Sequence, residues 1–314
     1  MRASRLLSIM MLLQARGRMS AETLAAELRE LEPRAQVQLT FTEQYRTVVR
    51  TWTDGDFKGY RTISRATSTN FLDWTDPVPM TFGSAPVEHL YTSQTHPYFR
   101  APHLYVATPM RFVPGRQVLT PEQAKLLGVN PGYVSDAAEA VFMTSRGGTT
   151  YSRRFLEGFI RPGPDPGNWA SRAGLTALGI VPTGPAEMSL YKQAHYAQPS
   201  GHLVRYTLRT DGFVSVNAPF SGGEFVTQLL TFTGNRLFLN FSTGAAGSLR
   251  VEIQDSNGTP IPGFTLAESA EWIGDDTERT EPWKSGRSLE SLKNQPVHLR
   301  FALKDADLYS LQFR

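Results

Sequence analysis

The stretch that decides the fold is Ser248-Leu249-Arg250-Val251-Glu252-Ile253-Gln254, in which polar and apolar residues alternate strictly. Successive side chains of a β-strand point to opposite faces, so the three apolar residues share one face and the polar residues the other. This alternation predicts an antiparallel strand with one buried face and one wet face. Residues 236–242, 296–303 and 308–313 alternate similarly, and Ser256-Asn257-Gly258 supplies a turn. We therefore expect an antiparallel β-sandwich over residues 216–314.

The composition excludes several classes of protein. Of the 314 residues, 40% are hydrophobic and 19% are charged, which is typical of a globular protein with a sizeable core. The net charge of +3 is spread over 32 basic and 29 acidic residues, so no concentrated field attracts nucleic acid or anionic lipid. The absence of cysteine excludes disulfides, thiolate metal sites and cysteine nucleophiles. No apolar run approaches the roughly 20 residues of a membrane span, so we expect no membrane partner.

Residues 36–215 also predict β-structure, but in shorter pieces. Alternating segments separated by turn signals occur at residues 45–52, 60–65, 140–144 and 202–209, among others. Only residues 121–127, preceded by the N-cap candidate Thr120, have a helical pattern. The segments 61–74 and 140–151 each run from a strand into a Ser-containing turn followed by an aromatic residue, which we expect to pack against the sheet. Repeated units of this kind predict radially arranged blades, and thus a partial β-propeller.

These strands and turns resemble the five-bladed β-propeller glycosidases, the broad group of invertase-like and arabinanase-like enzymes. The resemblance covers roughly residues 40–215, and residues 216–314 resemble the β-sandwich appended to the invertase-like members. It implies a mainly β protein, a partial propeller of the five-bladed type followed by a sandwich, with an oligo- or polysaccharide as ligand. In such enzymes carboxylates from different blades meet in a central pocket. Trp272 and Trp283, in a charged segment of the sandwich, are the candidate surface aromatics.

Three carboxylates are candidates for catalysis. Glu187 stands at the start of a strand after the turn Thr183-Gly184-Pro185. The resemblance implies that it is the general acid, a role in which burial must raise the pKa of the carboxyl group. Asp136 or Glu139, which precede the strand at 140–144, would supply the partner carboxylate. The alternative for all three is a solvated charge at a strand or loop end, which is the commoner position of Asp and Glu.

The candidates for substrate binding form a dense polar and aromatic cluster in the sequence, His96, Tyr98, Arg100 and His103. Arginine and imidazole groups hydrogen-bond sugar hydroxyls, and aromatic faces stack on sugar rings. The segment 97–103 resembles the Arg-Asp-Pro motif of invertase-like enzymes, but Ala101 stands in place of the Asp, and a methyl group cannot balance an oxocarbenium charge. The same residues also suit a buried structural network. We expect no cofactor and no metal, because two histidines seven residues apart are a weak metal-binding pattern.

Residues 1–30 carry a different, helical pattern. Apolar residues recur at helical spacing in residues 6–13, and a second short helix is indicated after a Gly-containing turn. The run 5–28 resembles the opening of bacterial winged helix-turn-helix regulators of the DeoR and WYL-domain type. In those proteins a recognition helix follows and enters the major groove. Here Leu31-Glu32-Pro33 ends the helical pattern, so sequence-specific DNA is an unexpected partner.

The apolar residues near the start of the chain also invite comparison with a signal peptide. Ser8 and Gln14 interrupt or end the apolar run, and Ala15-Arg16-Gly17 is a poor cleavage site. We therefore expect no signal peptide, and the cytoplasm is the default location.

Three functions follow from these patterns. The first is a glycoside hydrolase-like protein that uses Glu187 together with Asp136 or Glu139. The second is a catalytically impaired saccharide-binding or structural protein on the same scaffold. It is favoured by Ala101 and by the absence of a first blade, which supplies the nucleophile in the resembled enzymes and whose place the helical segment takes. The third, a fragment of a helix-turn-helix regulator, rests on residues 5–28 alone. The patterns indicate neither the sugar, nor the linkage, nor the oligomeric state.

Overall fold

The computed structural model describes residues 45–55 and 57–314. The chain divides into two compact units, one of residues 1–46 and 67–75 and the other of residues 47–66 and 76–314. The predicted helices in residues 1–30 lie outside the described residues. No helix in the described part of the chain is both long and apolar enough to cross a membrane.

The described part of the first unit contains one of the two predicted turns. The Ser68 hydroxyl accepts hydrogen bonds from the backbone N–H groups of Asn70 (3.2 Å) and Phe71 (2.8 Å). The Asn70 side chain accepts in turn from the backbone of Asp73 at 2.8 Å. The turn chemistry is thus as expected, but the aromatic packs differently. Trp74 lies edge-on against Phe71, with ring centroids 5.5 Å apart, and remains 36% exposed.

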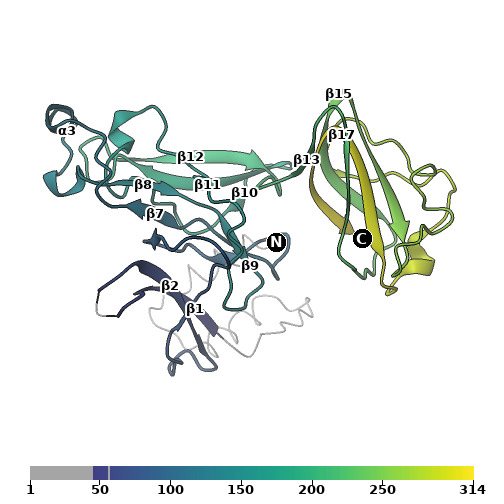
Figure 1. The fold of residues 1–314 in the computed structure, drawn as a ribbon, viewed down its shortest axis with the longest axis horizontal. Helices are drawn as coiled ribbons and strands as arrows, with labels where there is room; N and C mark the ends of the chain where they lie inside the picture. Colours follow the sequence, from purple (N-terminus) through teal and green to yellow (C-terminus); the bar gives the residue numbers. More distant parts are fainter. Residues whose placement is uncertain (1–44, 56) are drawn as a thin grey trace, which may run out of the picture. The chain divides into compact units, whose positions relative to one another are not determined.

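Residues 45–209 contain four small sheets of three strands each (Figure 1). The first comprises β1 (Tyr45–Trp52), β2 (Arg61–Ser68) and β3 (Val78–Pro79), and the second comprises β4 (His89–Leu90), β7 (Met110–Val113) and β8 (Ala137–Ala140). The third comprises β5 (His96–Pro97), β6 (Tyr105–Ala107) and β9 (Met143–Ser145), and the fourth β10 (Val181–Pro182), β11 (Glu187–Ala194) and β12 (His202–Arg209). Neighbouring strands in the last three sheets run antiparallel.

The described residues contain one α-helix, α3 (Pro121–Leu127), and it begins where the sequence predicts. The Thr120 hydroxyl accepts from the backbone N–H of Gln123, whose side chain accepts from the backbone of Thr120, forming a capping box. Gly128 ends the helix in the left-handed conformation at φ 69°. Three short 3-10 turns complete the helical structure of this part: η1 (Pro131–Tyr133), η2 (Pro166–Asn168) and η3 (Leu289–Leu292).

Apolar side chains from neighbouring sheets pack into common clusters. One cluster joins the first three sheets through Ile63, Leu90, Ala107 and Met143. Another joins the third sheet to the fourth through residues that include Val106, Met188 and Leu190. Sheets that share cores in this way fit the prediction of repeated β units. A complete propeller is not confirmed, because the blades of known propellers have four strands and these sheets have three.

The remaining strands form one five-stranded antiparallel sheet: β13 (Val216–Ala218), β14 (Gly223–Val226), β15 (Leu237–Gln254), β16 (Asp275–Arg279) and β17 (His298–Phe313). β17 pairs with β13, β14 and β15, and the register with β15 is interrupted between Thr243 and Ser248. Gly247 lies in this interruption, where an added Cβ would come within 2.3 Å of the Asp305 carbonyl oxygen. The predicted pair of stacked sheets is not confirmed; the core lies between a single sheet and the segments that connect its strands, which contribute Phe264, Trp272 and Trp283.

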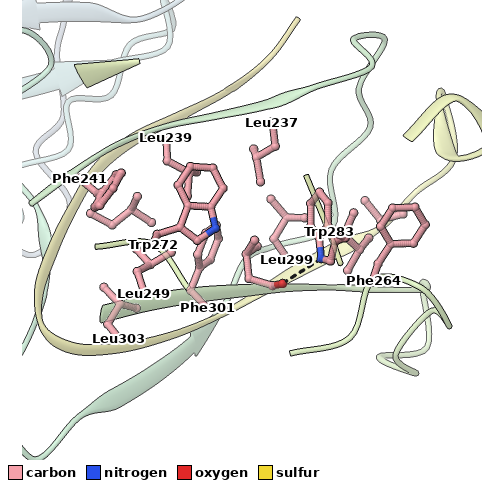
Figure 2. Close-up of a cluster of buried hydrophobic side chains, with 14 of the residues drawn as sticks. Leu237, Leu239, Phe241, Leu249, Phe264, Trp272, Trp283, Leu299, Phe301 and Leu303 are labelled. Carbon is pink, nitrogen blue, oxygen red and sulfur yellow. Dashed lines mark hydrogen bonds between the residues drawn. The ribbon is translucent and has the colours of Figure 1, made fainter. Parts of the chain in front are cut away.

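Figure 2 shows that core, which the decisive stretch of β15 supplies in part. Leu249, Val251 and Ile253 are each at most 1% exposed, so their shared apolar face is confirmed. The prediction that Trp272 and Trp283 are surface aromatics is wrong, because they are 1% and 5% exposed. Trp272 exchanges two backbone hydrogen bonds with Leu249, and the Trp283 indole donates to the Val251 carbonyl oxygen at 3.2 Å. Backbone pairing for Trp272 and the indole hydrogen bond for Trp283 thus hold both rings in the core although their sequence neighbours are charged.

The opposite face of the same stretch is more buried than expected. Glu252 and Gln254 are 4% and 7% exposed, where the alternation predicts a wet face. The Glu252 carboxylate accepts from the Leu266 backbone at 3.0 Å and from the Gln254 amide at 2.8 Å. Arg300 lies 3.4 Å from it on the neighbouring strand. The buried carboxylate is therefore hydrogen-bonded and paired with a cation, as its burial requires.

Candidate functional site

Glu187, the predicted general acid, is a half-exposed residue at the start of β11. The Thr183 hydroxyl donates to its carboxylate at 2.7 Å, and the Arg205 guanidinium from the adjacent strand β12 forms an ion pair with it. The charge of this carboxylate is thus balanced by a dedicated partner. The geometry suits a stable charged strand end, which is the alternative that the sequence left open.

Asp136 and Glu139 lie close in sequence but have separate partners. Asp136 accepts a hydrogen bond from the backbone N–H of Gly115 at 2.9 Å. Glu139, in β8, forms an ion pair with Arg111 of β7, which also reaches Glu88 at 3.0 Å. No hydrogen bond or ion pair of the described residues connects Glu187 with either carboxylate. Each of the two glutamates is therefore engaged by an arginine of a neighbouring strand.

The ion pairs around Glu88 extend to a deeply buried arginine. Arg153 has a side chain only 1% exposed, and its Nη1 atom lies 2.5 Å from Glu88. Its Nε and Nη2 atoms have no hydrogen-bond partner among the described residues. Glu88 thus holds two guanidinium groups, of Arg153 and of Arg111, while Arg111 joins it to Glu139. This network accounts structurally for Glu139.

Of the predicted binding residues, Tyr98 and Arg100 are brought together by Asp211. The Tyr98 hydroxyl donates to the Asp211 carboxylate at 2.5 Å, and Arg100 lies 3.3 Å from the same carboxylate oxygen. Arg100 also pairs with Glu278 at 3.0 Å. Burial, followed by the hydrogen bond to Asp211, raises the pKa of Tyr98 far above its usual value. These contacts describe the structural network that the sequence allowed as an alternative.

The two predicted histidines lie in different surroundings. Both ring nitrogens of His96 contact the backbone, Nδ1 at 2.9 Å from the Gln94 carbonyl oxygen and Nε2 at 3.1 Å from the N–H of Ile180. His96 is therefore neutral, with the proton on Nδ1, and burial lowers its pKa. His103 is exposed in the loop that follows Arg100. Within the described part of the chain, no group of three or more metal-binding side chains is found.

The feature that the sequence did not reveal is a cluster of three arginines around Tyr91, which follows β4. The guanidinium carbons of Arg50, Arg61 and Arg172 lie 4.6, 5.4 and 5.5 Å from the centre of its ring. These residues come from β1, from β2 and from the loop after η2. None of the three forms an ion pair with a carboxylate among the described residues, whose ion pairs lie elsewhere. We call this group the Tyr91 arginine cluster.

The cluster gathers like charges at an energetic cost. Because Arg50 and Arg172 lie near the same ring, their charges are at most about 10 Å apart. Two unit charges at that distance repel by about 0.4 kcal/mol in water and about 1.7 kcal/mol at an effective dielectric constant of about 20. Burial, and then these two neighbours, lower the pKa of Arg61, while Tyr91 and Asp136 oppose the shift. The hydrogen bond from Arg50 and the surrounding cations lower the pKa of Tyr91.

Arg172 is held in place by backbone strain and by tyrosines. Its φ of 66° lies in the left-handed region, which costs a non-glycine residue roughly 1 kcal/mol or more. Its Nη1 atom donates to the Tyr133 hydroxyl at 2.9 Å, and its guanidinium lies 4.7 Å from the centre of that ring. A fixed arginine whose charge is not neutralised by a carboxylate marks a candidate site for an anion or a polar ligand.

A cavity of about 360 Å³ adjoins the cluster. Arg50 and Tyr91 line it together with apolar and hydroxyl-bearing or amide side chains, Val48, Ile63, Thr92, Ser93 and Gln94. Its wall thus combines an aromatic face, a guanidinium and small polar groups. The four residues of the Tyr91 arginine cluster are far apart in the sequence and form no motif. The sequence signal for them is that Arg50 and Arg61 lie within two predicted strands.

Comparison with known proteins gives weak similarities. No protein-family model matches the chain, and no curated protein matches it. Among solved structures, a glycoside hydrolase family 43 arabinoxylan arabinofuranohydrolase from Bacillus subtilis, in complex with cellotetraose, is 11% identical, with a TM-score of 0.25 over 87% of this chain and 52% of that chain. A GH32 beta-fructofuranosidase from Bombyx mori is 8% identical, with a TM-score of 0.28 over 87% of this chain and 89% of that chain. The chain thus spans about half the length of the first protein.

Both neighbours are glycoside hydrolases, the class of enzyme that the sequence resembles. With identities of 11% and 8% and TM-scores below 0.3, these similarities assign neither an activity nor a site.

Proposed function

We propose that this protein binds a saccharide on a glycosidase-like β scaffold, with the ligand in the cavity beside Tyr91. The observation that carries the proposal is the lining of that cavity, which combines the apolar side chains of Val48 and Ile63 with polar groups of Arg50, Thr92 and Ser93. A sugar presents C–H groups that pack against apolar side chains and hydroxyl groups that need hydrogen-bond partners. A concave site with an apolar face and a few polar groups meets both needs.

The contacts of the predicted catalytic carboxylates favour saccharide binding without hydrolysis. Hydrolysis by two carboxylates requires both groups to flank one glycosidic bond, about 5 to 10 Å apart. Glu187 is instead paired with Arg205, and Glu139 with Arg111. Ala101 also lacks the oxygen atoms with which an aspartate at this place would stabilise positive charge.

Hydrolysis is a second candidate because of one observation. The charge of Asp136, one of the predicted catalytic carboxylates, partly opposes the lowering of the pKa of Arg61 in the Tyr91 arginine cluster. In this proposal Asp136 acts on a sugar bound beside Tyr91, with Glu187 as the general acid. A screen with aryl glycosides tests it: turnover by the wild type that is lost in both Asp136→Asn and Glu187→Gln supports hydrolysis. Turnover that persists in the two variants rules out both residues.

Binding itself is tested by electrophoresis through native gels that contain dissolved polysaccharides. We expect at least one polysaccharide to retard the wild type, and the Tyr91→Ala variant to lose this retardation. Tyr191→Ala is the matched control, because Tyr191 is a 37% exposed tyrosine on β11 outside the cavity. Failure of every polysaccharide to retard the wild type contradicts the proposal, as does undiminished retardation of Tyr91→Ala.

A further inference from the structure

We infer that the cavity beside Tyr91 receives the anionic group of an acidic saccharide, a uronate carboxylate or a sulfate ester. The inference rests on the proposed saccharide binding and names the class of ligand. Its basis is the placement of Arg50, Arg61 and Arg172 around one ring without a carboxylate ion pair among the described residues.

The arginines around Tyr91 differ from other arginines of the chain in their partners. Arg111, Arg205 and Arg300 each pair with at least one glutamate, which is how this chain ordinarily balances a guanidinium. The arginines around Tyr91 contact aromatic rings instead. Arg61 lies 4.7 Å from the centre of the Trp52 ring and 4.8 Å from that of Phe112. Aromatic faces orient a guanidinium and stabilise it, but they leave its net charge in place.

The positive charge of the Tyr91 arginine cluster can be reached from the cavity. Arg50 is exposed and lines the cavity directly, whereas Arg61 and Arg172 are half-buried beside Tyr91. A carboxylate or sulfate bound at Arg50 would therefore also be attracted by the two arginines behind it. The guanidinium group offers paired donors that match the oxygen atoms of either anion.

Little negative charge opposes the positive charge of the Tyr91 arginine cluster among the described residues. Asp136 is the acidic residue that stabilises the charge of Arg61, and its own carboxylate accepts from Gly115. Among the described residues, one carboxylate acts on the charge of Arg61 while three guanidinium groups surround Tyr91, which leaves an excess of positive charge. A neutral sugar gains nothing from this excess, while an anionic sugar relieves the repulsion within the cluster.

The experiment uses matched pairs of polymers in the same native gels. Polygalacturonate is compared with its fully methyl-esterified form, and carrageenan with desulfated carrageenan. We expect the full chain to bind the acidic member of one pair at least about tenfold more tightly than its neutral member, since a hydrogen bond to a charged group is stronger than one to a neutral group. The pair that discriminates identifies the anion as a carboxylate or a sulfate. Equal binding of both members in each pair overturns the inference and leaves saccharide binding intact, whereas binding of no polymer overturns both.

Variants locate the effect. Arg50→Gln and Arg61→Gln should each weaken binding of the acidic polymer about tenfold, with binding of the neutral polymer unchanged. Arg154→Gln makes the same change in net charge at an exposed arginine outside the cavity and should bind like the wild type. An equal loss in Arg154→Gln assigns the effect to net charge and overturns the inference. Should a variant fail to fold, the wild type decides: discrimination by the half-buried cluster should persist at a salt concentration that screens non-specific attraction to the polyanion, and its complete loss there overturns the inference.

Discussion

Removal of Glu88 should destabilise the protein strongly, because it leaves Arg153 buried without a counter-charge. The Arg153 side chain is 1% exposed, and Glu88 is its ion-pair partner at 2.5 Å. Removing one partner of a buried pair typically costs about 3 to 5 kcal/mol. Because the Glu88 side chain is 22% exposed, water can partly replace it, and we expect about 3 kcal/mol for Glu88→Ala. At about 2 to 4 °C for each kcal/mol, the melting temperature should fall by about 6 to 12 °C.

The assay is thermal and urea denaturation followed by circular dichroism, with a double variant to identify the cause. In the Glu88→Ala background, Arg153→Met removes the unpaired charge and should restore at least about 1 kcal/mol. Glu290→Ala is the matched control: Glu290 is 64% exposed and pairs with Lys293, so its loss should cost about 0.5 kcal/mol or less. A double variant no more stable than Glu88→Ala alone would refute the reasoning.

Three further predictions concern the core, a histidine and a glycine. Trp272→Ala should cost about 3 to 5 kcal/mol in denaturation, whereas a surface tryptophan would cost less than about 1 kcal/mol. His96 has a lowered pKa in the folded protein, so protonation favours unfolding: its contribution is complete above pH about 6.5 and is lost as pH falls through the folded pKa. Melting curves from pH 8 to 5 should therefore be less pH-dependent in His96→Asn, while His103→Asn should retain the wild-type dependence. Gly247→Ala should lower the melting temperature by several degrees because a backbone oxygen lies 2.3 Å from the new Cβ, whereas Gly148→Ala, with nothing within 4 Å, should not; equal melting temperatures would contradict this.

A strand could be predicted where the alternation of polar and apolar residues in its own sequence defines it. The apolar face of residues 248–254 is an example, since a period of two requires no knowledge of neighbouring elements. The burial of Glu252 was not predictable, because Leu266 and Arg300 come from other segments to cover it. Trp272 was misplaced for the same reason, since its backbone pairing with Leu249 is invisible in a charged stretch of sequence.

The candidate functional site was even less predictable from the sequence, because it also depends on contacts between distant segments. The sequence pointed to residues near one another in the chain, such as His96 and Tyr98, and in the structure both form hydrogen bonds within the protein. The Tyr91 arginine cluster instead joins positions 50, 61, 91 and 172, which lie in different strands and loops. Such a grouping depends on how the small sheets are arranged, and no spacing along the chain records it.

The central position of β17 has a consequence for synthesis of the protein. Since β13, β14 and β15 all pair with β17, none of these strands can complete its hydrogen bonding until residues 298–313 have left the ribosome. The nascent chain therefore presents one edge of the long β15, half of whose residues are apolar, without its β17 partner while the intervening segments are translated. Exposed strand edges recruit other chains, so this stage of biosynthesis is where chaperone protection matters most.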